Sequence, residues 1–236
     1  EFEPTNAANH YSEKLISLPN LGCYYSARNV TPVIPDLQSL GINPTAPILV
    51  CPGTPFKYAP DHDQILVSIA KKLPECQFIF FESPEQPLSS AFKERLSKAF
   101  EHENLNAAEF THFIPWQKTE AFYGLMQKAD VFLDTIGFSG FNTAIQAIEC
   151  GLPIVTREGL FMRGRLASGI LRRIGMTELI ANDEENYVNL AVKLVQDRIY
   201  RQAIQEKIIV NRSILFEDLA PIRALEEFLV QHVNTK

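Results

Sequence analysis

Short runs of apolar residues recur along the chain from residue 46 onward, and each is followed by a stretch with apolar residues at helical spacing. The first run, Pro47-Ile48-Leu49-Val50-Cys51, is closed by Pro52-Gly53, a pattern typical of a buried strand and its turn. Strands are predicted at 47–51, 77–81, 111–114, 131–134, 153–156 and 178–181. Because the runs are continuously apolar rather than alternating, we expect a parallel sheet with helices on both faces.

The stretches between these runs predict the covering helices. Residues 61–72 carry an apolar stripe that includes Ile65 and Ile69, and Asp61 is expected to cap this helix. Further helices are predicted at 88–100, 118–128, 142–150, 163–174, 184–196, 199–209 and 218–232. Gly151 suits a left-handed C-cap. The predicted fold class is α/β, a doubly wound, Rossmann-like parallel sheet with C-terminal helices.

The first 45 residues lack this alternation. A short helix is predicted at 10–18, and prolines interrupt the segment that follows it. We interpret residues 1–45 as a linker or entry arm, and residues 46–236 as one Rossmann-like domain. In a doubly wound sheet the ligand binds at the carboxyl ends of the strands, so the loops that follow the strands hold the candidate site.

The composition narrows the function further. Of 236 residues, 46% are hydrophobic and 21% are charged, and the net charge of −6 argues against a nucleic-acid partner. No apolar run approaches the roughly 20 residues of a membrane span. The start, Glu1-Phe2-Glu3-Pro4, does not resemble a signal peptide. The cysteines and histidines are scattered, so no metal site is predicted and a reducing, cytoplasmic setting is expected.

The loop after the 131–134 strand opens directly into a helix. Ser139, Gly140, Phe141, Asn142 and Thr143 stand at this helix start, where free N–H groups and the helix dipole favour an anion. The loop matches neither the GxGxxG nor the P-loop pattern, so it predicts neither a Rossmann dinucleotide nor a P-loop site. The alternative is a glycine-rich turn in which Ser139 caps its own helix.

Other loops at the same edge carry charged residues. The loop after the first strand presents Thr54 and Lys57, although a solvated loop lysine is the alternative interpretation. Arg163 and Arg165 follow the 153–156 strand, and their guanidinium groups suit phosphate or carboxylate unless they pair with Glu158 and neighbouring acids.

Aromatic and amide side chains complete the edge. Trp116, with Gln117 beside it, follows the 111–114 strand and suits a nucleobase, although a lone tryptophan also serves as a core or domain-contact anchor. Gln146 lies one helical turn after Asn142, where it reaches a ribose hydroxyl or forms an ordinary surface amide. Together the anion site, the lysine, the arginines and the aromatic favour a nucleotide diphosphate.

Several motifs then follow one another in a specific order: Leu133-Asp134-Thr135, Ser139-Gly140-Phe141-Asn142-Thr143, Ala147-Ile148-Glu149-Cys150-Gly151-Leu152-Pro153, Arg165-Leu166-Ala167-Ser168 and Gly175-Met176-Thr177-Glu178-Leu179-Ile180-Ala181. They resemble the donor-binding stretch of protein O-GlcNAc transferases and their bacterial SPINDLY-like relatives, over about residues 45–235. The resemblance implies the C-terminal, UDP-sugar-binding half of a GT-B fold. It implies UDP-GlcNAc or a UDP-hexose as the donor, and neither an essential metal nor another cofactor.

The resemblance also implies residue roles. Lys57 falls where the family has a lysine that contacts the diphosphate and offsets the charge of the leaving UDP. The 139–143 turn would supply donors to the phosphates, and the backbone around Trp116-Gln117 would read the uracil. Two positions depart from the family: Gln146 is an amide where relatives have an acid that holds the ribose, and Phe141 replaces a histidine of the animal enzymes.

The implied function is therefore the donor-binding half of a glycosyltransferase that acts on protein or peptide acceptors. The acceptor groove is expected in the N-terminal half, so we expect this chain alone to bind donor without efficient transfer. Two alternatives stay open. One is another GT-B-like enzyme, such as a nucleotide-sugar epimerase or a transferase to a non-protein acceptor. The other is a non-catalytic nucleotide-binding or interaction module, which the amide of Gln146 keeps open.

Overall fold

A computed structural model describes residues 1–82 and 86–233. Its centre is a six-stranded sheet in the order β3-β2-β1-β4-β5-β6, and every strand pair is parallel. The strands are β1 (Ile48–Cys51), β2 (Gln77–Phe81), β3 (Thr111–Ile114), β4 (Val131–Leu133), β5 (Ile154–Arg157) and β6 (Ile180–Ala181). In the centre of the sheet, Leu49 of β1 lies opposite Phe78 on one side and Val131 on the other. These strands form because their continuous apolar runs are buried on both faces.

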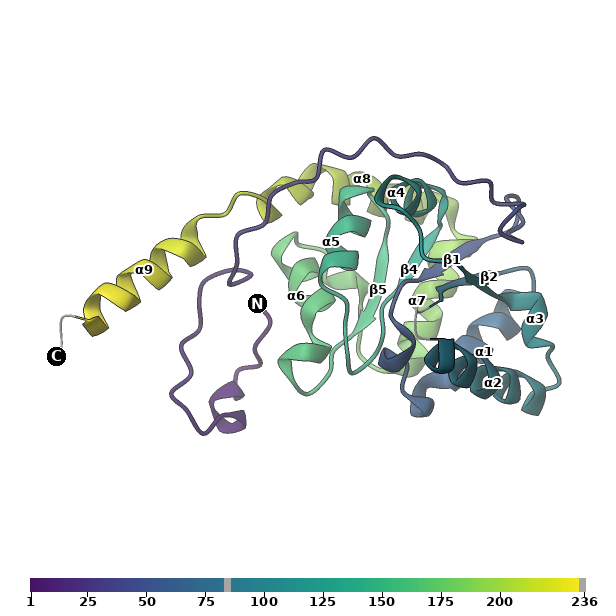
Figure 1. Cartoon of the computed structure of the whole chain (residues 1–236), viewed down its shortest axis with the longest axis horizontal. Helices are drawn as coiled ribbons and strands as arrows, with labels where there is room; N and C mark the ends of the chain where they lie inside the picture. The colour runs from purple at the N-terminus through teal and green to yellow at the C-terminus, as the bar shows by residue number, and fades with distance from the viewer. Residues whose placement is uncertain (83–85, 234–236) are drawn as a thin grey trace.

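Helices cover both faces of this sheet (Figure 1). They are α1 (Asp63–Lys72), α2 (Gln86–His102), α3 (Ala107–Phe110), α4 (Thr119–Lys128), α5 (Asn142–Glu149), α6 (Leu166–Arg173), α7 (Glu184–Gln196), α8 (Arg198–Asn211) and α9 (Ala220–Val233). In one layer α1 packs against α2 and α7, and in the other α5 packs against α4 and α6. The prediction of a doubly wound α/β fold is confirmed, and Gly151 has the expected positive φ of 72°.

Large apolar side chains fill the space between the sheet and the helices. Leu49, Phe78, Phe80 and Phe132 are fully buried, and Phe80 stacks on Phe113 with ring centroids 4.9 Å apart. Burial of side chains of this size stabilises the fold by about 1.5–3 kcal/mol each. The rigid sheet is what holds the loops at its carboxyl edge in place.

The N-terminal arm (residues 1–45) contains one short 3-10 helix, η1 (Ala7–His10), and otherwise runs as irregular chain along the body and over its top edge (Figure 1). The prediction of a helix at 10–18 is wrong, because residues 11–18 are not helical. A helix this short depends on an apolar face packed against other elements, whereas Tyr11 and Ile16 are each 40% exposed. The arm is nevertheless attached, because Leu21, Leu37 and Ile42 are buried in the core.

At two helix starts a 3-10 turn replaces the predicted first residues of the helix. Asp61 does not cap α1. It lies in a 3-10 turn, η3 (Pro60–His62), and the helix begins at Asp63, which is buried and pairs with Arg95 at 2.7 Å. The helix predicted to start at Arg163 begins at Leu166, because the 3-10 turn η4 (Met162–Gly164) precedes it.

Candidate functional site

The carboxyl ends of β1 and β4 are neighbours at the centre of the sheet. The chain that leaves β1 enters α1 in one helical layer, whereas the chain that leaves β4 enters α5 in the other. This divergence opens a crevice at the point where the strand order reverses, which is the position where open α/β sheets bind ligands. Residues 52–62 and 134–141 border it.

The turn between β4 and α5 is organised around Asp134, which is 5% exposed. Its Oδ2 accepts hydrogen bonds from the hydroxyls of Ser139 at 2.6 Å and Thr156 at 2.7 Å. Its Oδ1 accepts the backbone N–H of Gly140 at 2.8 Å. A Cβ on Gly140 would lie 2.6 Å from Thr143 Oγ1, so a side chain at this position would displace the Thr143 hydroxyl.

Ser139 is fully buried and its polar groups are used within the protein. Its hydroxyl donates to Asp134 and accepts the N–H of Ala167 in the first turn of α6, at 2.8 Å, while its own N–H donates to Arg163 O. The alternative interpretation of Ser139 as the cap of its own helix is therefore wrong, because its side chain satisfies the next helix instead.

The N-terminus of α5 is left open by this arrangement. Phe141 is the N-cap residue, and its side chain makes no capping hydrogen bond. The first N–H groups of a helix have no carbonyl within the helix, so those of exposed Asn142 and half-buried Thr143 remain free at the positive end of the helix dipole. They are the donors that remain for an anion.

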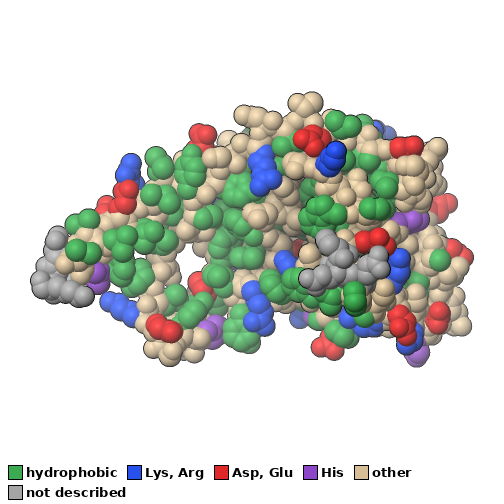
Figure 2. Space-filling view, in the orientation of Figure 1, with side chains coloured by type: hydrophobic (Ala, Val, Ile, Leu, Met, Phe, Trp, Pro, Cys, Tyr) green, Lys and Arg blue, Asp and Glu red, His purple; other side chains and the backbone are tan. Residues whose placement is uncertain are grey.

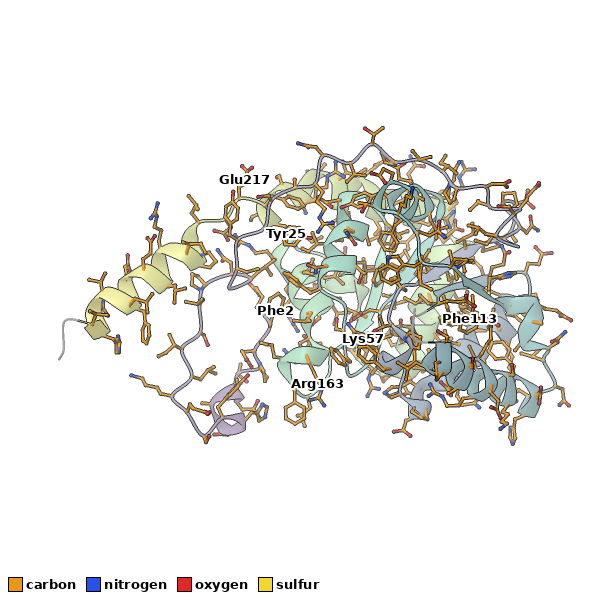
Figure 3. All side chains as sticks on the ribbon, viewed as in Figure 1. Phe2, Tyr25, Lys57, Phe113, Arg163 and Glu217 are labelled. Carbon is orange, nitrogen blue, oxygen red and sulfur yellow. The ribbon has the colours of Figure 1, made fainter. Side chains whose placement is uncertain are left out.

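Lys57 reaches this turn from the opposite side of the crevice. It ends the 3-10 turn η2 (Pro55–Lys57), and its Nζ donates to Ser139 O at 3.3 Å and lies 4.5 Å from the centroid of the Phe138 ring. Burial lowers the pKa of Lys57, and the charge of Asp134 opposes that shift. Figure 3 shows Lys57 below the strand ends.

Thr54 precedes this lysine in the same loop. Its Oγ1 is buried and has no hydrogen-bond partner among the residues that the structure describes. Gly53 lets the loop approach β4, since a Cβ there would lie 2.7 Å from the Thr135 side chain. The Thr54 hydroxyl is thus a donor without a partner in the loop that carries Lys57, whose backbone N–H donates to Thr54 O at 2.9 Å.

A pocket adjoins the open end of α5 on the side of α4. Its lining brings together four residues that the sequence singles out: Trp116, Gln117, Thr143 and Gln146. Trp116 is 66% exposed and meets Phe81 edge-on, so it does not serve as a core anchor. The pocket combines an aromatic wall with amide groups, which suits a nucleoside.

The two candidate arginines, Arg163 and Arg165, have different environments. Arg165 is half-buried, pairs with Glu158 at 3.0 Å and donates to Phe2 O at 2.9 Å, as the alternative interpretation expects. The exposed guanidinium of Arg163 lies 5.2 Å from the Phe161 ring and forms no ion pair among the described residues. Arg163 contacts the turn through its backbone carbonyl, which accepts the N–H of Ser139 at 2.8 Å.

The side chain of Phe141 contacts the N-terminal arm. Its ring meets Phe2 edge-on at 5.7 Å and Tyr25 at 6.0 Å, and Figure 3 shows Phe2 and Tyr25 beside α5 and α6. The aromatic that departs from the family thus anchors the N-terminal arm next to the turn.

The model of the family described as glycosyl transferase family 41 matches residues 42–220. The chain belongs to glycosyl transferase family 41. Among curated relatives, a probable UDP-N-acetylglucosamine--peptide N-acetylglucosaminyltransferase SPINDLY of Eustoma exaltatum subsp. russellianum is 35% identical over 75 residues, or 32% of this chain and 8% of the relative. A UDP-N-acetylglucosamine--peptide N-acetylglucosaminyltransferase of Caenorhabditis elegans is 32% identical over 107 residues, or 44% of this chain and 9% of the relative. The matches thus span less than a tenth of these relatives.

Solved structures show the same fold. A mutant O-GlcNAc transferase of Thermobaculum terrenum superposes with a TM-score of 0.77 at 22% identity, covering 98% of this chain and 43% of that one. The sucrose-phosphate synthase of Thermosynechococcus elongatus gives 0.59 at 17% identity, covering 93% and 52%. This family 41 chain therefore has the fold of part of a GT-B glycosyltransferase.

Several residues of the candidate site were not among those predicted from the sequence. Asp134 carried the clearest signal, an acid at the end of an apolar strand directly before the glycine-rich turn. Thr156 and Tyr187 gave none, since they reach Asp134 only through the fold. Arg28 of the N-terminal arm lines the pocket that contains Trp116 and Gln146, and it lies in a segment that the sequence analysis interprets as a linker.

Neither a metal cluster nor a membrane span is found in the described part of the chain. Residues 1–82 and 86–233 contain no group of three or more His, Cys, Asp or Glu side chains placed to hold a metal ion. Their helices are too short or too polar to cross a membrane.

Proposed function

We propose that this chain binds the UDP-sugar donor of a family 41 glycosyltransferase across the carboxyl edge of its sheet. The observation that carries the proposal is the convergence of two loops: the Lys57 ammonium lies 3.3 Å from Ser139 O, beside the open N-terminus of α5. A cation and free backbone N–H groups on two sides of one crevice fit a diphosphate.

The nucleoside would occupy the adjoining pocket. Trp116 offers a ring face to the base, and Gln146 on α5 offers an amide to the ribose hydroxyls. Thr143 belongs both to this pocket and to the first turn of α5, so a ligand in the pocket is led directly to the anion site.

Lys57 would act on the leaving group. When the bond between the sugar and the diphosphate breaks, negative charge grows on the UDP oxygen, and a preorganised ammonium stabilises that charge more than the ground state. The N–H groups of Asn142 and Thr143 and the Thr54 hydroxyl would share the charge. No step of this account requires a metal ion.

The uridine nucleotide and the acceptor are inferred from relatives. Those named above are UDP-N-acetylglucosamine--peptide transferases. We propose a UDP-sugar donor, with UDP-GlcNAc as the first candidate, and a protein or peptide acceptor held mainly by residues outside this chain.

Calorimetric titration of the chain with UDP, UDP-GlcNAc, GDP and NAD tests the proposal. We expect UDP and UDP-GlcNAc to bind, and Lys57→Ala to weaken binding by about 10- to 100-fold, the contribution of one charged hydrogen bond. Lys128→Ala is the matched control, because this exposed lysine ends α4 at the opposite edge of the sheet.

The other outcomes select the alternatives. A preference for NAD contradicts the proposed donor site, and failure to bind any of the four ligands favours a non-catalytic interaction module. Equal losses in Lys57→Ala and Lys128→Ala would mean that overall charge, and not the crevice, attracts the ligand.

A further inference from the structure

The carboxylate of Asp134 ties together several elements that border the crevice. Gly140 and Ser139 belong to the turn before α5, and Thr156 belongs to β5. Through the Ser139 hydroxyl the network continues to Ala167 N in α6, and the Tyr187 hydroxyl of α7 donates to Asp134 O at 2.8 Å. The Asp134 side chain therefore fixes the turn relative to β5 and, through Ser139, to α6, while the backbone carbonyl of Asp134 holds α7.

The hydrogen bonds favour an ionised carboxylate. Gly140 contributes an N–H, and the Ser139 hydroxyl, which already accepts from Ala167, directs its proton to Asp134. A carboxylate accepts at both oxygens, whereas a protonated acid has one oxygen occupied as a donor. Burial raises the pKa of Asp134, and the N–H of Gly140, the two hydroxyls and Lys57 oppose that shift.

The cation that faces this carboxylate is Lys57. Both side chains line the same small cavity behind the turn, together with Cys51 of β1, Tyr58, and Tyr187 of α7. The remaining titratable groups of the cavity, His62 and Asp63, are paired with Glu184 and Arg95.

The Ser139 carbonyl joins the two parts of the site. Lys57 Nζ donates to it, and the hydroxyl of the same serine is held by Asp134. A displacement of Asp134 would therefore move the acceptor of the ammonium as well as the turn.

We propose that Asp134 is a positioning residue of the donor site, which holds the 139–140 turn and keeps the Lys57 ammonium charged and in place in the absence of ligand. This role is distinct from the proposed contact between Lys57 and the phosphates. Its use in donor binding rests on the proposed function. The coupling between the two side chains exists in the unliganded chain, so it is testable without any nucleotide.

The first measurement is the titration of the Lys57 side chain by NMR in the unliganded 236-residue chain, with Lys57→Arg to assign the signal. Asp134→Asn preserves the shape of the side chain and removes its charge. We expect the titration midpoint of Lys57 to fall by about one pH unit, as for the loss of one nearby opposite charge. Thr156→Val, which keeps the carboxylate and removes one hydrogen bond, is expected to leave the midpoint close to that of wild type.

An unchanged Lys57 midpoint in a folded Asp134→Asn variant overturns the proposal. If that variant does not fold, the reciprocal substitution decides. Lys57→Gln alters only a half-exposed loop residue, and coupling is mutual. The midpoint of the Asp134 carboxyl must then rise, and its constancy overturns the proposal equally.

UDP titration separates this proposal from the donor proposal. If wild type binds UDP, Asp134→Asn should bind more weakly, and its affinity should decline at a lower pH than that of wild type. A uniform loss at every pH would indicate a structural role alone and contradict the inference. If wild type does not bind UDP but the Lys57 midpoint still shifts, the donor proposal fails and the coupling stands.

Discussion

At the residue scale, Lys57 is held between burial, which lowers the pKa of its ammonium, and the charge of Asp134, which raises it. The pKa is lowered on balance, so the ammonium loses its proton at a lower pH than an exposed lysine. A diphosphate needs the protonated form. The affinity for UDP should therefore be full near neutral pH and decline as pH rises through the pKa of Lys57, below the ordinary value of 10.5.

Calorimetry of UDP binding over a rising pH series measures this decline. Lys57→Arg is the matched variant, because a guanidinium keeps its charge throughout the range. Any titration of the nucleotide itself appears equally in both proteins. A decline of the same size in Lys57→Arg would show that Lys57 does not cause it.

The predictability of the site also differs from residue to residue. Thr54, Lys57, Trp116 and Gln146 could be placed at one edge because each lies in a loop or in the first two helical turns after a predicted strand. The pairing of Arg165 with Glu158 was one of the two interpretations open from the sequence. The contacts of Ser139 with Ala167 and of Arg165 with Phe2 could not be foreseen, because these partners lie far away in sequence and only the packing of the elements brings them together.

At the scale of elements, the N-terminal arm is held to the helices at two glycines. A Cβ on Gly124 in α4 would lie 2.1 Å from Val33 O, and a Cβ on Gly169 in α6 would lie 2.3 Å from the Phe2 ring. Both glycines are in helix interiors, where alanine is otherwise favoured by about 1 kcal/mol. The two positions differ in what must give way: backbone at Gly124 and a movable ring at Gly169.

This difference predicts opposite effects of the same substitution. Gly124→Ala should lower the free energy of unfolding by about 1–3 kcal/mol, because the arm backbone must shift. Gly169→Ala should be neutral or stabilising, because the Phe2 ring can turn aside. Urea unfolding measures both, and hydrogen exchange around residue 33 should accelerate in Gly124→Ala alone. A stabilised Gly124→Ala variant would mean that the arm does not pack on α4.

For the whole molecule, α9 extends away from the body, and hydrophobic side chains border the hollow between this helix, the arm and the body (Figures 1 and 2). Leu225, Leu229 and Val233 on α9 are each at least 40% exposed. The chain corresponds to 43% of the similar O-GlcNAc transferase structure. The candidate donor crevice is thus present in a chain that matches less than half of that protein.

We therefore predict that the isolated chain binds UDP-GlcNAc but transfers no detectable sugar to a peptide acceptor. Catalysis needs the acceptor held against the donor, and this positioning supplies much of the rate. Mass spectrometry of the peptide after incubation measures transfer, and calorimetry on the same sample confirms that donor is bound. Transfer at a rate typical of complete glycosyltransferases would contradict the prediction.

The strands, most of the helices and the edge of the sheet that carries the candidate site could be predicted from the sequence. These features follow from local patterns: apolar runs make buried strands, and the loops after parallel strands share one edge. The prediction of a helix at residues 10–18 was wrong, because a short helix needs a packed apolar face that the fold does not provide there.

Which polar groups remain for a ligand depends on how the elements pack against one another. The Asp134 carboxylate accepts hydrogen bonds from the Ser139 and Thr156 hydroxyls and from the Gly140 N–H. The first N–H groups of α5 and the Lys57 ammonium therefore remain for a ligand. A hydrogen bond between residues distant in sequence depends on the arrangement of whole elements. No local pattern in the chain specifies it.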